Sequence, residues 1–403
     1  MNFLDIPDFI EKYVTKRSSS FFEKDIIEYQ FILSEKIKGK SVLVVGGAGT
    51  IGSSYIKAIL KFKPLKLVIV DINENGLTEL TRDLRSTPNQ FIPEDYKTYP
   101  MSLGEPVFVK MFENEGPFQV VANFAAHKHV RSEKDIYSIE AMLNNNVFKT
   151  KEFLDLLVKN KPEHFFCVST DKAANPVNIM GASKKLMEDI LISYSSELNI
   201  STARFANVAF SNGSLLAGFI DRIYKNQPIA CPTDIKRFFV SPEESGQICM
   251  LACFLGDSGE IFFPKLEHEK LTNFKEITIN FFNQLNREIL VCKSENEAKN
   301  KSTTISKTDP YPVYFFESDT TGEKLFEEFI TDKDEVDYIK FSSLGVIKNT
   351  EKISKSKIES IIFELKKLID SENYTKSSIV NFLKQHIPNF QHIETGKSLD
   401  QKM

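Results

Sequence analysis

Short apolar runs alternate with amphipathic segments between about residues 41 and 211 of this chain. The apolar runs are SVLVV, LKLVIV, FQVVANF, HFFCVST and STARFANVAF, and between them lie segments with helical spacing such as SSYIKAILK and TKEFLDLLVKN. Strands that are apolar throughout are typical of a parallel sheet covered on both faces, with helices as the crossovers. The pattern therefore predicts an α/β fold with a doubly wound parallel sheet.

The flanking regions have a different pattern. Residues 1–38 mix apolar and charged positions at helical spacing and predict an N-terminal helical extension before the main unit at 39–210. After about residue 211 the alternation of apolar runs and helical segments becomes less regular, and it predicts a smaller α/β region at 211–345 that is interleaved with the main unit. Within this region, the polar residues 293–308 predict a solvated loop. The segments KISKSKIESIIFELKKLI and KSSIVNFLKQHI predict helices in a C-terminal extension at 346–403.

Composition and charge exclude several classes of partner. The 403 residues carry a net charge of -4, from 51 basic and 55 acidic side chains, so there is no general electrostatic reason to bind nucleic acid or an anionic membrane surface. The start, MNFLDIPDFIEK, does not resemble a signal peptide, and no run approaches the ~18 apolar residues of a membrane span. We therefore expect a cytoplasmic protein without a membrane segment.

The cysteines and histidines do not predict a metal site. The five cysteines show no CxxC spacing, and most lie in apolar runs, as buried thiols in a reducing compartment would. His127 and His129 have the spacing of a ligand pair, but no third ligand follows at a suitable distance. The cysteines are Cys167, Cys231, Cys249, Cys253 and Cys292.

A glycine-rich turn joins the first predicted strand to the first predicted helix. Its glycines have GxxGxxG spacing, which permits a tight turn and lets the backbone approach a pyrophosphate at a helix start. Asp71 follows 19 residues after Gly52, at the end of the next strand, where a carboxylate can accept hydrogen bonds from ribose hydroxyls. The carboxylate would repel a 2′-phosphate and no arginine follows, so NAD is favoured over NADP; the alternative is that Asp71 only caps the next turn. The sequence thus predicts a Rossmann-like NAD-binding unit, with the cofactor contacts Gly46, Gly49, Thr50, Ile51, Gly52, Asp71, Ala125, Ala126 and Lys184.

The run VSTDKAANP places polar side chains at the carboxyl end of a predicted strand, where ligands of open parallel sheets bind. In NIMGASKK downstream, Met180 lies four residues before Lys184, so both share a helix face. Many nicotinamide-dependent enzymes carry a tyrosine at the Met180 position. A methionine cannot take a proton, so either the chemistry is lost or other groups perform the acid and base steps.

The segments AAHKHV, NNNVFKT, VSTDKAANPVNIMGASKK and ARFANVAFSNGS resemble the extended short-chain dehydrogenase/reductase superfamily. Within it they are most similar to the UDP-N-acetylglucosamine 4,6-dehydratases of the polysaccharide-biosynthesis type, in which the Met180 position holds either tyrosine or methionine. The resemblance covers roughly residues 40–344 and touches the tail HIETGKSLDQKM. It implies a soluble NAD-dependent hydro-lyase that makes precursors of surface polysaccharides or glycans.

The resemblance also implies an internal redox reaction: oxidation at C4 of the sugar, elimination of water across C5 and C6, and hydride return to C6. For this reaction the residues at the strand end supply Asp171 as the acid for the 6-hydroxyl, Lys172 as the C5 base, and Thr170 as a hydrogen-bonding partner at O4. Lys184 assists electrostatically. The group that deprotonates the 4-hydroxyl stays open between Asp171, Lys172 and a water molecule.

The smaller α/β region is expected to bind the nucleotide sugar, and a planar guanidinium suits two phosphate oxygens. The substrate-side residues are predicted to be Lys128, Asn145, Asn207, Ser214 and Arg237. The segment SDTTGEK departs from the family pattern because Thr320 and Thr321 stand where arginine and proline are usual. This departure weakens the expectation of a uridine nucleotide.

Three alternatives stay open: a 4-epimerase, a dehydratase that inverts C5, and a non-catalytic NAD-binding protein, for which Met180 is the main argument. We expect a homo-oligomer. The terminal extensions carry Phe21, Phe22, Phe382 and Ile387, which are predicted to be exposed and to serve oligomer contacts or to cover the sugar site.

Overall fold

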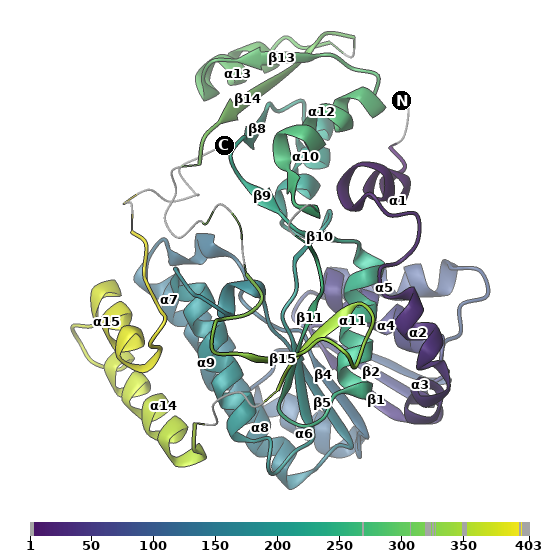
Figure 1. Cartoon of the computed structure of the whole chain (residues 1–403), viewed down its shortest axis with the longest axis vertical. Helices are drawn as coiled ribbons and strands as arrows, with labels where there is room; N and C mark the ends of the chain where they lie inside the picture. Colours follow the sequence, from purple (N-terminus) through teal and green to yellow (C-terminus); the bar gives the residue numbers. More distant parts are fainter. Residues whose placement is uncertain are drawn as a thin grey trace.

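The computed structural model describes residues 4–267, 270–306, 308–318, 324, 326, 328–348, 353–394 and 396. Its main lobe is a sheet of nine strands in the order β15-β16-β11-β6-β5-β4-β1-β2-β3 (Figure 1). The strands from β3 to β11 are parallel, and β16 and β15 are antiparallel at one edge. This confirms the predicted α/β class. The strands are β1 (Ser41–Val45), β2 (Lys66–Asp71), β3 (Asp95–Pro100), β4 (Val120–Asn123), β5 (His164–Val168), β6 (Ile200–Ala203), β11 (Glu260–Pro264), β15 (Glu335–Asp337) and β16 (Leu344–Lys348).

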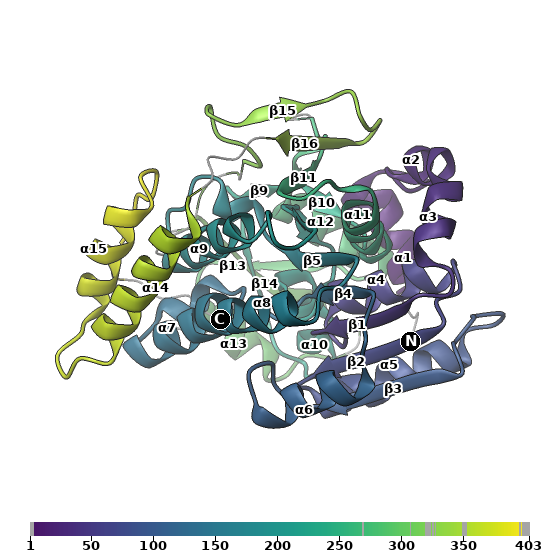
Figure 2. The same ribbon diagram turned by 90° about the horizontal axis from the view of Figure 1, so that it is seen from below.

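Helices cover both faces of this sheet, because its central strands are apolar on both sides (Figure 2). One face packs against α3 (Gln30–Ile37), α4 (Thr50–Leu60), α5 (Glu74–Ser86) and α11 (Pro242–Leu255). The other face packs against α6 (Pro106–Glu115), α7 (Ile136–Leu143), α8 (Lys149–Lys159) and α9 (Ile179–Ser193). The core therefore has two halves, one on each side of the sheet.

In the centre of the sheet, the carboxyl ends of β1, β4 and β5 lie at the same level. Val45 of β1 lies opposite Asn123 of β4, which lies opposite Cys167 of β5. The loops that follow these strands, including the glycine-rich turn and the Thr170–Lys172 segment, therefore emerge at the same edge.

Two stretches differ from the predicted elements. The run STARFANVAF forms two strands, β6 and β7 (Asn207–Val208), and β7 leaves the main sheet to pair with β10 (Phe239–Val240). The strand β3 is absent from the predicted set, since its sequence DYKTYP is polar and its residues are at most half-buried at the sheet edge.

A smaller lobe lies above the main sheet in Figure 1. Its parallel sheet has the order β13-β14-β8, and the short strands β9 and β12 pair below it. Residues 293–308 were predicted to be a solvated loop, and this is wrong for Glu295–Ser302, which form a helix that Ser294 caps and that buries Ala298. The elements are α10 (Leu215–Tyr224), β8 (Ile229–Pro232), β9 (Lys236–Arg237), β12 (Thr272–Asn273), α12 (Phe274–Gln284), β13 (Ile289–Cys292), α13 (Glu295–Ser302) and β14 (Tyr311–Phe316).

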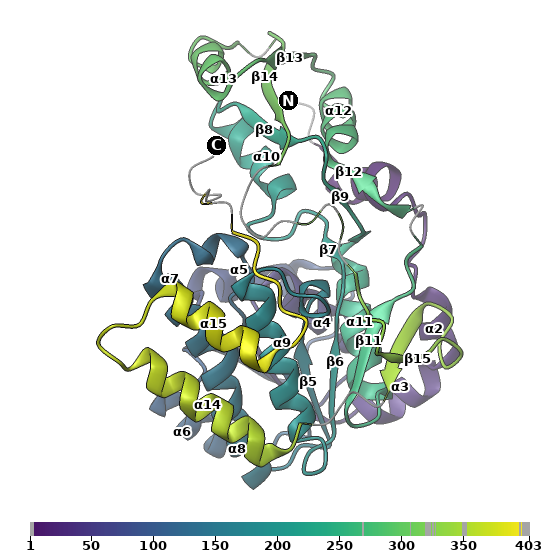
Figure 3. The same ribbon diagram turned by 60° about the vertical axis from the view of Figure 1, so that its left-hand side comes forward.

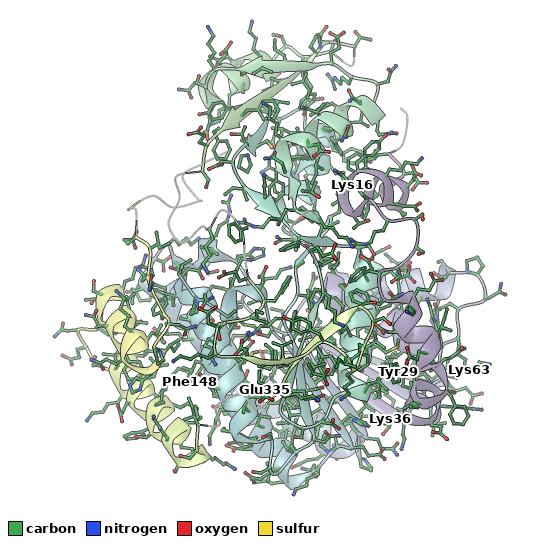
Figure 4. The ribbon with its side chains drawn as sticks, viewed as in Figure 1. Lys16, Tyr29, Lys36, Lys63, Phe148 and Glu335 are labelled. Atoms are coloured by element: carbon green, nitrogen blue, oxygen red, sulfur yellow. The ribbon has the colours of Figure 1, made fainter. Side chains whose placement is uncertain are left out.

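The N-terminal segment runs along both lobes. Lys16 forms an ion pair with Glu276 of α12 at 2.9 Å, while Tyr29 donates to Lys340 O at 2.8 Å beside the main sheet (Figure 4). Phe22, predicted to be exposed, is fully buried in the core under α11. Its elements are α1 (Ile6–Phe9), the π-helical η1 (Ile10–Thr15), α2 (Glu23–Glu28) and α3.

The C-terminal helices α14 (Lys355–Ile369) and α15 (Lys376–His386) lie beside α9, on the outside of the main lobe (Figure 3). Lys355 pairs with Glu197 at 2.6 Å, and the Tyr374 hydroxyl donates to Glu140 of α7. Ile387 was predicted to be exposed but is 1% exposed, because the extension packs on the chain's own helices. Within the described part of the chain, no helix is long and apolar enough to cross a membrane.

Candidate active site

The glycine-rich turn between β1 and α4 has no room for side chains at two of its glycines. A Cβ on Gly46, whose φ is +76°, would lie 2.5 Å from Ala125 N, and a Cβ on Gly52 would lie 2.4 Å from Gly46 O. Positive φ at Gly46 also disfavours any other residue. The backbone of the turn is therefore packed directly against the loop after β4.

A pocket of about 500 Å³ opens in front of this turn. The residues that were predicted to contact the cofactor line it together, with the exception of Lys184. They are Gly46, Gly49, Thr50, Ile51, Gly52, Asp71, Ala125 and Ala126. Sequence reasoning missed Asn212, whose N–H donates to Thr50 Oγ1 at 3.0 Å and so ties the turn at 211–214 to the glycine-rich turn.

Asp71 has a structural role and a place in the pocket wall. Its Oδ2 accepts from Ala48 N at 3.0 Å, and its Oδ1 accepts from Asn73 N at 2.9 Å. The carboxylate thus holds the glycine-rich turn and also lines the pocket. The cap role and the ribose role are compatible, since a carboxylate offers about four lone-pair sites.

A second pocket of about 580 Å³ lies between the two lobes and shares Lys128 and His129 with the first. Its lining is rich in cations, and among its described residues Asp221 is the acidic one. A cavity with this balance favours an anionic ligand. The cationic side chains are Lys128, Arg131, Lys172, Arg222 and Arg237. Sequence reasoning missed Arg131 and Arg222, although Arg131 follows AAHKHV directly and could have been identified from its place in that loop.

Four predicted substrate-side residues line this second pocket: Lys128, Asn207, Ser214 and Arg237. Asn207 Nδ2 is the buried side-chain atom that lacks a hydrogen-bond partner within the described residues. Such atoms are rare in folded proteins, so a donor there is available to a ligand. Ser214 caps α10, and Arg237 Nη1 donates to Lys236 O and Lys324 O at 2.9 and 3.0 Å. Residues 319–323, which include Thr320 and Thr321, lie outside the described residues.

The turn after β5 brings an acid and a lysine into contact. Lys172 Nζ donates to Asp171 Oδ1 at 3.0 Å, and Thr170 Oγ1 donates to the same oxygen at 2.9 Å. Asp171 is buried, while Lys172 lines the second pocket. The turn can therefore hold two proton-transfer groups at the edge of the cation-rich cavity.

Met180 and Lys184 lie on the buried face of α9 and line neither pocket. Lys184 Nζ donates to Val168 O at 2.7 Å and lies 3.1 Å from Met187 Sδ, and burial lowers the pKa of this lysine. In the structure Lys184 thus fixes α9 to the end of β5, and its predicted contact with the cofactor stays a prediction.

One of the predicted asparagines lies beside the first pocket and not the second. Asn145 was assigned to the substrate side, but it lines the first pocket. Its neighbour Asn146 is buried, accepts from His127 N at 2.9 Å and donates to Ser183 Oγ at 3.0 Å. Both lie in the π-helical η3 (Asn144–Phe148), a distortion common near functional sites. Asn146 therefore joins the loop after β4 to α9.

The described residues contain no group of three or more His, Cys, Asp or Glu that could hold a metal ion. All five cysteines are buried and unpaired, as predicted.

Residues 42–349 match the polysaccharide biosynthesis protein family. The chain is 31% identical over 308 residues to uncharacterized membrane protein MJ1061 of Methanocaldococcus jannaschii, covering 75% of this chain and 84% of that protein. It is 28% identical over 244 residues to the UDP-N-acetylglucosamine 4,6-dehydratase (inverting) of Campylobacter jejuni, covering 58% and 70%. A UDP-glucose 4-epimerase of Rickettsia rickettsii is 25% identical over 279 residues, covering 67% and 79%. The relatives thus include dehydratases and epimerases of nucleotide sugars.

Some relatives are much longer than this chain. Capsular polysaccharide biosynthesis protein CapD of Staphylococcus aureus is 28% identical over 235 residues, which is 57% of this chain but 39% of CapD. The chain therefore spans less than half the length of that relative.

Solved structures share the fold. Pen from Bacillus thuringiensis superposes with a TM-score of 0.62 at 21% identity, covering 81% of this chain and 98% of that one. DesIV, a dTDP-glucose 4,6-dehydratase from Streptomyces venezuelae with NAD and TYD bound, superposes with a TM-score of 0.55 at 16% identity, covering 73% and 89%. At these identities the likeness concerns the fold.

Proposed function

The chain belongs to the polysaccharide biosynthesis protein family, and we propose that within it the protein is an NAD-dependent nucleotide-sugar 4,6-dehydratase acting on UDP-N-acetylglucosamine. The observation that carries the proposal is the Asp171–Lys172 pair at the edge of a cation-rich pocket that adjoins the glycine-rich-turn pocket. A nucleoside diphosphate supplies the anion that the second pocket favours. The relative from Campylobacter jejuni supports the choice of sugar.

The first pocket fits NAD. Gly46 and Gly52 leave the backbone open to a pyrophosphate, and Asp71 offers a carboxylate at the end of β2 for the ribose hydroxyls. When bound, NAD supplies the hydride acceptor for C4 and the hydride donor for C6. DesIV, which has NAD bound, supports the same choice of cofactor.

The residues of the Thr170–Lys172 turn divide the proton transfers among them. Lys172 removes the proton from C5, which the C4 ketone has made acidic, and Asp171 protonates the departing 6-hydroxyl. Thr170, whose Oγ1 already lies 2.9 Å from Asp171 Oδ1, orients that carboxyl and bonds to O4. Since Met180 cannot accept a proton, Asp171, Lys172 or a water molecule takes the 4-hydroxyl proton.

The second pocket binds the nucleotide part of the substrate. Arg237 and the unpartnered Nδ2 of Asn207 bind the diphosphate, with the N-terminus of α10 at Ser214 beside them. Arg131 and Arg222 add positive charge around the same cavity. This arrangement is consistent with an anionic nucleotide and does not by itself select the base.

Asp71→Asn should lower the affinity for NAD about tenfold, because a charge-assisted hydrogen bond to the ribose becomes a neutral one. Affinity for NADP should stay the same or rise, because the carboxylate charge that repels the 2′-phosphate is removed. Calorimetric titration of both cofactors measures the two affinities. Asp83→Asn, which alters a carboxylate paired with Lys57 on the protein surface, is the matched control. An unchanged ratio of the two affinities would contradict the assignment.

The second candidate is a nucleotide-sugar 4-epimerase, which the Rickettsia rickettsii relative favours. An epimerase returns the hydride to C4 and needs neither a C5 base nor an acid for the 6-hydroxyl, so the transfer of the 4-hydroxyl proton would be the one task left for the Asp171–Lys172 pair. The dehydratase is therefore preferred.

Incubation with UDP-N-acetylglucosamine in deuterated water separates these reactions. A dehydratase gives a product that has lost one water and carries deuterium at C5 and a C6 methyl group, and proton NMR also reveals whether C5 is inverted. An epimerase gives the C4 epimer without loss of water. If a panel of UDP-, dTDP- and GDP-sugars all return unchanged while NAD binds, the non-catalytic alternative holds.

A further inference from the structure

The chain's own C-terminal segment, residues 387–394, here named the strap, packs against the residues that follow the Asp171–Lys172 turn. The strap runs beside residues 174–177, which lead from this turn to α9. Gln391 N donates to Pro176 O at 3.0 Å, and Ile393 N donates to Val177 O at 2.9 Å. Two backbone hydrogen bonds thus join the strap to the carbonyls of residues 176 and 177.

Side chains fix the strap in this register. Ile387 and Phe390 are 1% and 4% exposed and belong to the same apolar cluster as Ile179 and Ala182 of α9. Asn389 Nδ2 donates to Ala174 O. The strap is therefore packed as part of the core beside the turn.

A buried side-chain pair joins the strap to the first turn of α9. His392 Nε2 lies 3.3 Å from Glu133 Oε2, with side chains 6% and 4% exposed. Glu133 ends η2 (Val130–Glu133), in the loop that also carries the pocket residue Arg131. Its other oxygen, Oε1, accepts from Met180 N at 3.1 Å.

Met180 N is one of the helix-start N–H groups that have no partner within the helix. Glu133 satisfies this group from outside the helix, and its negative charge is favourable at a helix N-terminus. Asn178 caps the same turn by accepting from Gly181 N at 2.7 Å. The position at which many relatives of this fold carry a tyrosine is thus held through its backbone by a carboxylate.

The first turn of α9 is in direct contact with Lys172. A Cβ on Gly181 would lie 2.5 Å from Lys172 O, so the two backbones touch. A displacement of the first turn of α9 would therefore displace Lys172. Neither Glu133 nor His392 lines either pocket.

We propose that Glu133 and His392 are positioning residues: they seat the first turn of α9 and, through Gly181, hold Lys172 in place for proton transfer. This inference rests on the proposed function for its catalytic consequence, and on the geometry alone for its structural one. The pair lines neither pocket, so its loss is expected to act through the position of Lys172 and to affect turnover much more than binding.

Glu133→Ala should lower kcat about 10- to 100-fold, because displacements of about 1 Å at a catalytic group have effects of this size. KM for the nucleotide sugar and Kd for NAD should not change. Glu133→Gln keeps an acceptor for Met180 N and should restore most of kcat. His392→Ala should act in the same direction, and its effect should not add to that of Glu133→Ala. Lys376→Ala, which breaks an exposed ion pair with Glu394 of the strap, is the control and should match the wild type.

Hydrogen exchange supplies a test that does not need an active enzyme. In Glu133→Ala and His392→Ala, peptides that cover residues 173–181 should exchange faster, while peptides of β1, β4 and β5 should not change. If the wild type converts no nucleotide sugar but this exchange pattern appears, the proposed function fails and the positioning contact stands. Unchanged exchange at 173–181 would overturn the inference. A rise in KM without a fall in kcat, or failure of Glu133→Gln to restore turnover, would overturn it as well.

Discussion

Lys172→Ala is expected to lower turnover of the nucleotide sugar by about 10²- to 10⁴-fold, the usual contribution of a general acid or base. Lys172 lines the cation-rich pocket and contacts Asp171 at 3.0 Å, and it does not line the pocket of the glycine-rich turn. Affinity for NAD should therefore stay at the wild-type value. Steady-state kinetics and titration of NAD measure the two quantities.

Asp171→Asn separates the two proton-transfer roles. In deuterated water, this variant should still exchange the C5 proton through Lys172 but should not eliminate the 6-hydroxyl. Lys172→Ala should show neither exchange nor elimination. Lys61→Ala, which removes a lysine paired with Glu243 at the protein surface, is the control. If Lys172→Ala incorporates deuterium at C5 at the wild-type rate, Lys172 is not the C5 base.

The grouping of the proposed cofactor contacts around one pocket could be predicted from the sequence because its signals are local. The three glycines lie within one strand–turn–helix segment, and Asp71 ends the next strand. Parallel strands bring their carboxyl ends to one edge, so strand ends alone predict which residues meet. This logic also placed Thr170, Asp171 and Lys172.

The remaining parts of the site depend on contacts between distant segments. The second pocket combines a loop after β4, α10 of the smaller lobe and β9, and no periodic pattern marks Arg222 as facing a cavity. His392 and Glu133 are 259 residues apart in the sequence. A sequence pattern reports the local element and its buried face, whereas such pairings follow from the packing of the whole chain.

The sequence analysis missed strand β3 and helix α13 because the sequences of these two elements are polar. Strand β3 lies at the sheet edge and is only half-buried, so it lacks the apolar run that identified β1, β2, β4 and β5. Helix α13 buries Ala298 among charged residues and has the composition of a loop. Conversely, Phe22 and Ile387 were predicted to be exposed because they lie in the terminal extensions, outside the alternating strand and helix pattern. Both side chains are buried, because the extensions pack into the two halves of the core.

Glu188→Ala is expected to lower the free energy of unfolding by about 3–5 kcal/mol, because the buried Arg204 guanidinium loses the carboxylate that binds it in two places and keeps only the longer carboxylate contact of 3.5 Å to Asp334. Arg204 binds Glu188 through Nε and Nη2 at 2.9 and 2.7 Å, and the two side chains are 2% and 0% exposed. Glu188 Oε1 also accepts from Ser169 Oγ at 2.6 Å, directly before the Thr170–Lys172 turn. Urea unfolding at neutral pH measures the loss.

The pH dependence of this pair has a defined sign. Burial alone would raise the pKa of the Glu188 carboxyl, but the charge and hydrogen bonds of Arg204 hold it below its usual value. A lowered pKa in the folded state means that the stabilisation is present above the usual glutamate pKa of 4.5 and is lost as the pH falls through the folded value. The difference in stability between the wild type and Glu188→Ala should therefore shrink on acidification below that pH.

The double variant Glu188→Met/Arg204→Met tests whether the two side chains stabilise the fold through their interaction with each other or independently. Replacing a buried ion pair by apolar side chains of similar volume is often nearly neutral, whereas removing one partner leaves an uncompensated charge. The double variant should therefore be much less destabilised than the sum of Glu188→Met and Arg204→Met. If the losses add instead, the two side chains act independently, and the contribution of Arg204 comes from its contacts with Phe329 O at 2.8 Å and Asp334 at 3.5 Å.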